Sequence, residues 1–109
     1  MVTEFQKAVY ELCSRIPRGK VTTYKEIAHA LNSRAYRAVG QALRANPYAP
    51  QVPCHRVVAS DGSIGGFGGE ISGKNIAKKI KLLQREGVKI RDNRIVNFDS
   101  SFFKLTKER

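Results

Sequence analysis

Two short helical segments separated by a tight break constrain the fold of this chain most strongly. The stretch TTYKEIAHALN opens with Thr23 and Glu26 at capping-box spacing and carries apolar residues along one side. Asn32 interrupts this pattern, and a second helix over 34–46 must stop before Pro47. Two such helices outline a helix-turn-helix. We therefore expect a mainly α domain of the winged-helix-like, helix-turn-helix class with a small β element.

The remaining periodicities complete a single domain. Helical spacing predicts a first helix over 3–16, begun by a capping box at Thr3 and Gln6, and a last helix over 73–86. The 109 residues suit one domain, with a core over about 3–87 and a C-terminal extension over 88–109. The last helix should turn Ile76, Ile80 and Leu83 inward, and Lys74, Lys78, Lys79 and Lys81 largely outward.

The β element is expected after position 55. The stretch RVVAS has the β-branched residues of a short strand, and the Asp61–Gly62 pair marks a turn. Alternation around Asp92 and Asn93 indicates a small hairpin, VKIRDNRIVNF. The residues after it, through KLTKER, are predicted to be frayed.

The helix predicted over 34–46 has two distinct faces. Tyr36, Val39 and Leu43 recur on one side, which should pack inward, and Gly40 suggests that a neighbour approaches closely there. An ordinary solvated face is the alternative for the other side, but a face without one acid favours a nucleic-acid-reading helix. That side carries Arg34, Arg37, Gln41 and Arg44.

The net charge supports an anionic partner. Lys and Arg number 20 against nine acids, a formal net charge of +11 in a short chain. A merely solvated basic surface is possible in principle, but DNA or RNA is the partner that such an excess favours. The segment 57–69 carries one acid and no base, which indicates an uncharged pocket beside basic surfaces.

The two cysteines invite different interpretations. Cys13 falls inside the apolar stripe of the first helix, so we interpret it as a small core side chain. Cys54, in PQVPCHRVV, could be a packed thiol, a metal ligand or a nucleophile. With two cysteines, two histidines and no CxxC, four zinc ligands are hard to assemble, so no metal is expected. His55 and Arg56 beside Cys54 favour ionisation of its thiol, although sequence adjacency does not prove contact.

The glycine-rich stretch GGFGG at 65–69 cannot form regular structure. It is either a flexible surface loop or a backbone wall against a flat ligand. It is not a phosphate loop, because GxxxxGK[ST] is absent. The chain also has no apolar run long enough for a bilayer and no signal peptide, so we expect a cytoplasmic protein, nuclear in a eukaryote, without a membrane partner.

Four motifs together resemble the catalytic C-terminal domain of the O6-alkylguanine-DNA alkyltransferases, also called methylated-DNA–protein-cysteine methyltransferases. They are GKVTTYKEIA, RAVGQALRANP, PCHRVV and LLQREG, and they cover about 19–87. The pair of motifs PCHRV and RAVG…NP, at this separation, is highly specific to that family. The resemblance implies a monomer without cofactor that repairs duplex DNA containing O6-alkylguanine by flipping out the base and accepting its alkyl group in a single turnover.

The resemblance also implies a role for each matching residue. Cys54 is the expected nucleophile, His55 its base through a water, and Glu86 the residue that orients His55. Asn46 braces the turn before the cysteine, and Tyr24 donates or guides a proton to the leaving guanine. Arg37 is the expected finger that fills the gap left by the flipped nucleotide. The DNA surface would also include Thr23, Arg34, Ala38, Gln41 and Arg44, and the substrate pocket Pro53, Arg56, Val57, Phe67 and Gly68.

Several positions depart from the family pattern. Gly68 stands where many members have serine, Phe67 where tyrosine is common, and the stretch EISGKN looks longer than in some members. The usual N-terminal domain is expected to be absent. One rival hypothesis is an alkyltransferase-like damage sensor, a class that has Trp instead of the cysteine and does not react. Another is a helix-turn-helix DNA-binding protein whose cysteine is incidental. Reactivity of Cys54 discriminates among the three.

Overall fold

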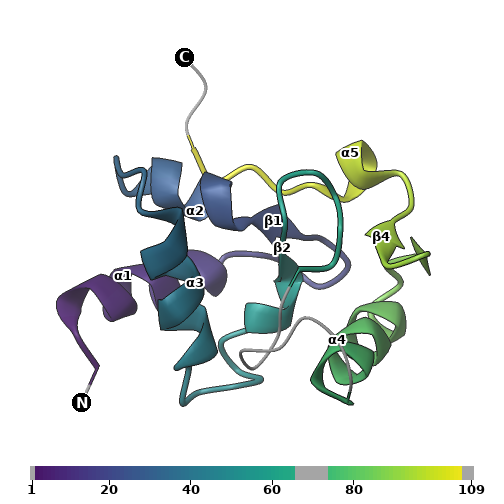
Figure 1. Cartoon of the computed structure of the whole chain (residues 1–109), viewed down its shortest axis with the longest axis horizontal. Helices are drawn as coiled ribbons and strands as arrows, with labels where there is room; N and C mark the ends of the chain where they lie inside the picture. The colour runs from purple at the N-terminus through teal and green to yellow at the C-terminus, as the bar shows by residue number, and fades with distance from the viewer. Residues whose placement is uncertain (1, 66–73, 107–109) are drawn as a thin grey trace.

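The computed structural model describes residues 2–65 and 74–106 as a mainly α domain with a small parallel sheet. Helices α1, α2 and α3 gather on one side of the β1–β2 pair, and α4 and β4 lie on the other (Figure 1). The predicted fold class is confirmed. The elements are α1 (Glu4–Cys13), β1 (Thr22–Thr23), α2 (Tyr24–Ala30), α3 (Tyr36–Arg44), η1 (Cys54–Arg56), β2 (Val57–Val58), α4 (Lys74–Arg85), β3 (Ile90–Arg91), β4 (Arg94–Ile95) and α5 (Phe98–Ser101).

The first helix begins where the sequence predicts and ends earlier. Thr3 and Gln6 form the expected reciprocal capping box. After Cys13 the chain tightens, because the N–H groups of Arg15 and Ile16 bond carbonyls three residues back. The prediction of helix through residue 16 was therefore wrong by one turn, although Ile16 is buried as expected.

Helices α2 and α3 form the predicted helix-turn-helix. The Thr23 hydroxyl caps α2 by accepting a hydrogen bond from the Glu26 N–H at 2.9 Å. The break comes at Asn32, whose φ of 57° is in the left-handed region that asparagine tolerates. Ser33 then accepts a hydrogen bond from the Ala35 N–H at 2.9 Å, and α3 starts one residue later.

The predicted capping box at Thr23 is only half formed, because the Glu26 carboxylate has other partners. It accepts hydrogen bonds from the N–H groups of Leu105 at 2.6 Å and Thr106 at 2.7 Å, and from the Thr106 hydroxyl at 3.0 Å. The expectation that the C-terminal residues are frayed is thus wrong as far as Thr106. This segment is fixed to the start of the helix-turn-helix by a carboxylate more than seventy positions away.

The parallel sheet lies between two hydrophobic clusters. Strand β1 pairs in parallel with β2, with Thr22 opposite Val57, and a further parallel bridge joins Val21 to Phe102. Adjacent side chains on a strand point to opposite faces. Accordingly Val57 packs with α1, α2 and α3, whereas Val58 packs with Ile76 and Leu83 of α4 and with Val21, Ile64, Val88 and Ile95. The predicted strand RVVAS is therefore confirmed only at its two valines, since Cys54–Arg56 form a 3-10 turn.

Two expectations for α3 were wrong. Val39 and Leu43 are buried, but Tyr36 is 39% exposed because its ring lies at the first turn, against His29 instead of the core. A Cβ added to Gly40 would meet no atom within 4 Å outside its own helix among residues 2–65 and 74–106, so none of these segments approaches it closely. The space beside Gly40 is open to the outside.

The predicted hairpin is confirmed as β3–β4. Asp92 and Asn93 have φ of 52° and 61°, as a two-residue type I′ turn requires, and Ile90 pairs with Ile95. The longest helix, α4, has 12 residues, and no helix of residues 2–65 or 74–106 is long and apolar enough to cross a membrane.

Candidate functional site

Cys54 lies at the first position of η1, at the end of a turn that Asn46 braces. The Asn46 side chain donates to the Val52 carbonyl at 2.9 Å and accepts from the Tyr48 N–H at 2.9 Å. The Cys54 N–H donates to the same Val52 carbonyl at 2.8 Å. These bonds fix the path of the chain from the end of α3 to the cysteine. The thiol is half-buried, and the preceding Pro53 is buried.

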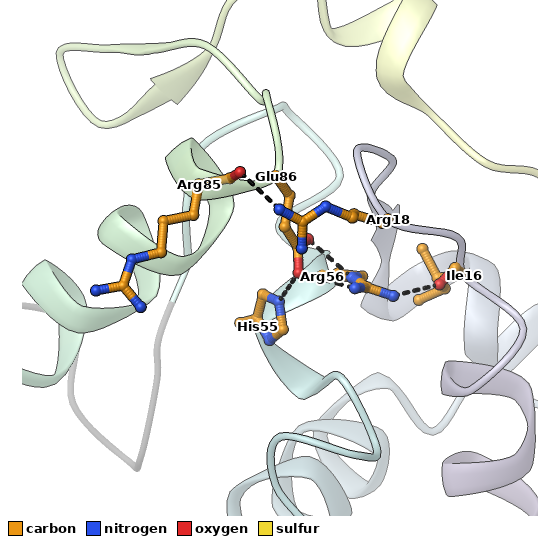
Figure 2. A network of polar contacts seen from close by, with 6 residues as sticks. All are labelled: Ile16, Arg18, His55, Arg56, Arg85 and Glu86. Carbon is orange, nitrogen blue, oxygen red and sulfur yellow. Dashed lines mark hydrogen bonds and ion pairs between the residues drawn. The ribbon is translucent and has the colours of Figure 1, made fainter.

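His55, Arg56 and Glu86 form one buried network (Figure 2). The Glu86 carboxylate accepts from His55 Nε2 at 2.9 Å, and from Arg56 Nε and Nη2 at 2.9 and 2.8 Å. The side chains of His55 and Glu86 are only 4% and 7% exposed. Arg56 Nη1 also donates to the Ile16 carbonyl at 2.7 Å, which ties the network to the end of α1. The sequence motifs PCHR and REG are thus brought together across 30 residues.

The network sets the protonation state of His55. A carboxylate only accepts hydrogen bonds, so His55 Nε2 carries the proton and Nδ1 keeps a lone pair. Burial lowers the pKa of His55, and the opposing effect of the hydrogen bond that His55 donates to Glu86 does not reverse this. Burial alone would raise the pKa of Glu86, but hydrogen bonds from Arg56 and His55 lower it instead. The site therefore presents a neutral imidazole, oriented by a carboxylate, that can take a proton at Nδ1.

The two cysteines differ sharply in environment. Cys13 is fully buried, and burial raises the pKa of its thiol to about 12. A thiol that stays protonated is a poor nucleophile. Cys54 is half-buried, in the same turn as His55. The interpretation of Cys13 as a core side chain is confirmed, and Cys54 is the thiol available for chemistry.

Tyr24 begins α2 and lies against Gly65. A Cβ on Gly65 would come within 3.3 Å of the Tyr24 hydroxyl oxygen, and Gly65 has a φ of 75°. Only glycine meets both conditions without strain. The close approach at Gly65 is to a tyrosine ring of the chain itself, and the hypothesis of a backbone wall against a flat ligand stays a prediction. The other predicted pocket residues of this loop, Phe67 and Gly68, and the stretch 70–73, lie outside the described residues.

Lys79 is the residue of this region that sequence reasoning misplaced. It was predicted to point outward, yet its side chain is fully buried. Its Nζ donates to the Val57 carbonyl at 2.8 Å and the Ile64 carbonyl at 2.6 Å, and lies 5.9 Å from the centre of the Tyr24 ring. Four lysines share the α4 sequence, so periodicity alone could not single out one that enters the core. Through these two hydrogen bonds Lys79 connects β2 to Ile64, the residue before the Gly65 that lies against Tyr24.

Lys79 also predicts a pH dependence of stability. Burial lowers the pKa of Lys79 from 10.5 to about 7, a change that the nearby Cys54 partly opposes. Above pH 7 the unfolded chain therefore holds a proton that the folded chain has lost, so stability rises with pH. We expect the free energy of unfolding to rise by about 1 kcal/mol per pH unit between pH 7 and 9, measured by urea denaturation.

In Lys79→Met this rise should vanish, whereas in Lys78→Met, which changes the exposed neighbour, it should persist. A wild-type profile that is flat over this range would show that the Lys79 amine keeps its ordinary basicity in the folded protein.

The predicted basic face of α3 is exposed. Arg34, just before α3, and Arg37, Gln41 and Arg44 on it are all solvent-exposed, as is Ala38, and α3 contains no acid. Thr23 does not belong with them. It is 5% exposed and its hydroxyl caps α2, so we infer that it supports the helix instead of contacting a partner. The described molecule thus pairs a half-buried cysteine with an exposed cationic helix, and one braced turn joins them.

The chain matches the family model described as "6-O-methylguanine DNA methyltransferase, DNA binding domain" over residues 4–88. That match includes the cysteine turn, the His55–Glu86 network and the helix-turn-helix. The chain belongs to this family. The C-terminal segment that Glu26 holds lies beyond the matched residues.

Individual relatives agree with this assignment. The methylated-DNA–protein-cysteine methyltransferase of Thermococcus kodakarensis is 51% identical over 89 residues, which are 81% of this chain and 47% of that protein. The crystal structure of Mycobacterium tuberculosis OGT in complex with DNA aligns with a TM-score of 0.70 at 40% identity, covering 79% of this chain and 51% of that one. S. pombe Atl1, in complex with damaged DNA containing O6-carboxymethylguanine, aligns with a TM-score of 0.81 at 34% identity, covering 95% and 99%.

The chain spans about half the length of the curated methyltransferases that it matches. Its similarity to Atl1 instead extends over nearly the whole of both chains. The methylated-DNA–protein-cysteine methyltransferases and Atl1 therefore share this fold. The chemistry of the site must decide which of the two this protein resembles in activity.

Proposed function

We propose that this protein repairs O6-alkylguanine in duplex DNA by moving the alkyl group irreversibly onto Cys54. The single observation that carries the proposal is the half-buried Cys54 in one turn with a buried histidine that Glu86 orients. The family relationship supports the same reaction, and the exposed cationic α3 supports a DNA substrate.

The first step is activation of the thiol. Cys54 gives its proton, through a water, to Nδ1 of His55, while Glu86 stabilises the imidazolium that forms. The thiolate then attacks the alkyl carbon. The new S–C bond forms as the bond between that carbon and O6 of guanine breaks. A thioether has no easy route back to a thiol, so each molecule reacts once.

The leaving guanine must gain a proton to become the normal base. Tyr24, held between Gly65 and the Lys79 amine, donates or guides that proton to the departing base. The proton that His55 took from Cys54 then replaces the one that Tyr24 gave to guanine, so both residues return to their starting protonation states. Overall, one thiol and one alkylated guanine become one thioether and one guanine.

The reacting carbon is shielded in a stacked duplex, so the nucleotide must rotate out. Helix α3 would lie in the minor groove, with Arg37 filling the gap and its other basic side chains on the phosphates. This arrangement gives sequence-independent affinity that falls with salt. Arg56 does not extend this surface, because Glu86 and Ile16 hold its guanidinium inside.

The proposal is tested by the fate of the lesion. A duplex carrying one O6-methylguanine is incubated with increasing protein, then digested to nucleosides and analysed by chromatography. We expect unmodified guanine to appear in equimolar amount to the protein, without added cofactor. A lesion that stays intact in a tight complex would instead support a non-reacting damage sensor, the candidate favoured by the full-length match to Atl1.

Arg37→Ala should separate the duplex reaction from the chemistry. If Arg37 holds the flipped state, we expect repair of duplex DNA to slow by about tenfold or more. Reaction with free O6-alkylguanine should slow much less, since no base needs flipping. Single-turnover rates on both substrates make the comparison. Arg91→Ala, which removes an exposed arginine from β3, controls for net charge. Equal losses of rate on both substrates would show that Arg37 does not fill the gap left by the flipped nucleotide.

Gly40→Ala should stabilise the protein and weaken DNA binding. The added methyl group meets no atom within 4 Å, and alanine favours a helix interior over glycine by about 0.5–1 kcal/mol. If the groove of the DNA closely approaches α3, the same methyl group should obstruct it. We expect a higher Tm together with a several-fold higher Kd for duplex DNA. A higher Tm with unchanged affinity would mean that the duplex does not approach Gly40.

A further inference from the structure

Tyr36 and Tyr48 are the large apolar side chains that the described residues leave exposed, at 39% and 48%. Tyr48 lies in the turn after α3, and its ring packs edge-on against the Tyr10 ring with centroids 5.8 Å apart. Tyr36 lies at the opposite end of α3 and has a different partner. Its ring contacts the His29 ring with centroids 6.0 Å apart, and its hydroxyl lies 3.3 Å from His29 Nε2.

The His29–Tyr36 pair bridges the outside of the helix-turn-helix. His29 is in the last turn of α2 and Tyr36 is the first residue of α3, and both side chains are exposed. Arg37 follows Tyr36 directly, and Arg34 precedes it by two positions. An aromatic ring is thus held beside the cationic face of α3, at the end where its first turn begins.

Packing within the chain does not account for this ring. The apolar side of α3 is filled by Val39, Ala42 and Leu43, and Tyr36 lies outside that set. An exposed ring contributes little hydrophobic free energy until another surface removes it from water. Duplex DNA offers such a surface, because the sugars and the base edges that line its grooves take apolar contacts.

We propose that Tyr36 contacts duplex DNA next to Arg37, and that His29 positions its ring for that contact. The proposal rests on the proposed function only in that α3 faces the duplex. The ring would pack against sugar and base edges of the strand beside the gap that Arg37 fills. When His29 Nε2 carries a proton it donates to the phenol oxygen, and the Tyr36 O–H is then free to donate to a phosphate.

The test measures binding, which does not require alkyl transfer. Fluorescence anisotropy with an unmodified labelled duplex gives the Kd, and thermal unfolding checks that each variant is folded. We expect about tenfold weaker binding for Tyr36→Ala and a smaller loss for Tyr36→Phe, which keeps the ring. Tyr48→Ala removes an exposed ring at the other end of α3 and should keep the wild-type affinity.

The positioning role of His29 has its own comparison. His29→Ala should weaken duplex binding, as Tyr36→Ala does. In the Tyr36→Ala background the same His29→Ala change should weaken binding much less. His29→Gln, whose amide can still donate to the phenol oxygen, should restore most of the affinity. Wild-type affinity in Tyr36→Ala would overturn the proposal. Equal losses in Tyr36→Ala and Tyr48→Ala would also overturn it, because the effect would not be specific to this ring.

Failure of the proposed function would look different. If the wild-type protein leaves an O6-methylguanine duplex unrepaired but Tyr36→Ala still weakens duplex binding, alkyl transfer is refuted and the Tyr36 contact stands. If repair proceeds and Tyr36→Ala binds duplex DNA like the wild type, alkyl transfer stands and the Tyr36 contact is refuted.

Discussion

We expect replacement of Cys54 with alanine to abolish alkyl transfer and to leave binding of alkylated duplex DNA intact. The thiol is half-buried in η1, and the bonds that shape this turn come from the backbone and from Asn46. Alanine keeps those backbone bonds, so the fold and the α3 surface should not change. Without sulfur there is no acceptor for the alkyl group. Single-turnover assays should therefore show no restored guanine, while the Kd for the lesion duplex stays within a few-fold of wild type.

Cys13→Ala is the matched control for this variant. Cys13 is buried in the core and burial holds the pKa of its thiol at about 12, so it cannot replace Cys54 as acceptor. Cys13→Ala should lose some stability and keep full stoichiometry of transfer. Residual transfer by Cys54→Ala would mean that another group accepts the alkyl group, and the assignment of the nucleophile would be wrong.

Glu86→Gln should lower both the rate of transfer and the stability. A glutamine amide has a single accepting oxygen, so it cannot accept from His55 Nε2 and from both Arg56 donors as the carboxylate does. It is also neutral, so it stabilises less well the imidazolium that forms when His55 takes the Cys54 proton. General-base contributions predict a loss of about a hundredfold or more in the transfer rate. Because the side chain is buried and paired with Arg56, we also expect a loss of about 3 kcal/mol in the free energy of unfolding.

Glu26→Gln is the comparison that separates these two effects. The Glu26 carboxylate also accepts three hydrogen bonds, but from the C-terminal segment, with no contact to His55. This variant should lose stability while the folded protein reacts at nearly the wild-type rate. If Glu86→Gln and Glu26→Gln slow the reaction equally at a temperature where both are folded, Glu86 supports the fold alone and does not orient His55.

Local signals predicted the elements that depend on local chemistry. Thr3 and Gln6 hydrogen-bond to the backbone beside them and so begin α1. Asn32, Asp92 and Asn93 tolerate a positive φ, which allows the break after α2 and the two-residue turn between β3 and β4. The helix-turn-helix follows from the Thr23 cap and the Asn32 break in succession. The family resemblance, and no local signal, implied that Asn46 braces the turn before the cysteine, where its side chain makes two hydrogen bonds.

The buried lysine and the incomplete capping box depend on contacts between distant segments. Lys79 is buried because two carbonyls, of Val57 and Ile64, converge on its amine, which no pattern within α4 indicates. Glu26 does not complete its capping box because Leu105 and Thr106 return to it. Tyr36 lies at the periodicity of an inward residue, but α3 starts beyond the edge of the core. The pairing of His55 with Glu86 was available only from the family resemblance.

The measurement that tests the central claim most directly is a peptide mass analysis after reaction with an O6-methylguanine duplex. Trypsin should release Cys54 within residues 45–56 and Cys13 within residues 8–15. We predict that the Cys54 peptide gains the mass of one CH2 group in every molecule, that the Cys13 peptide stays unchanged, and that further duplex adds nothing. An unmodified Cys54 peptide from protein that has bound the lesion would contradict alkyl transfer by this protein.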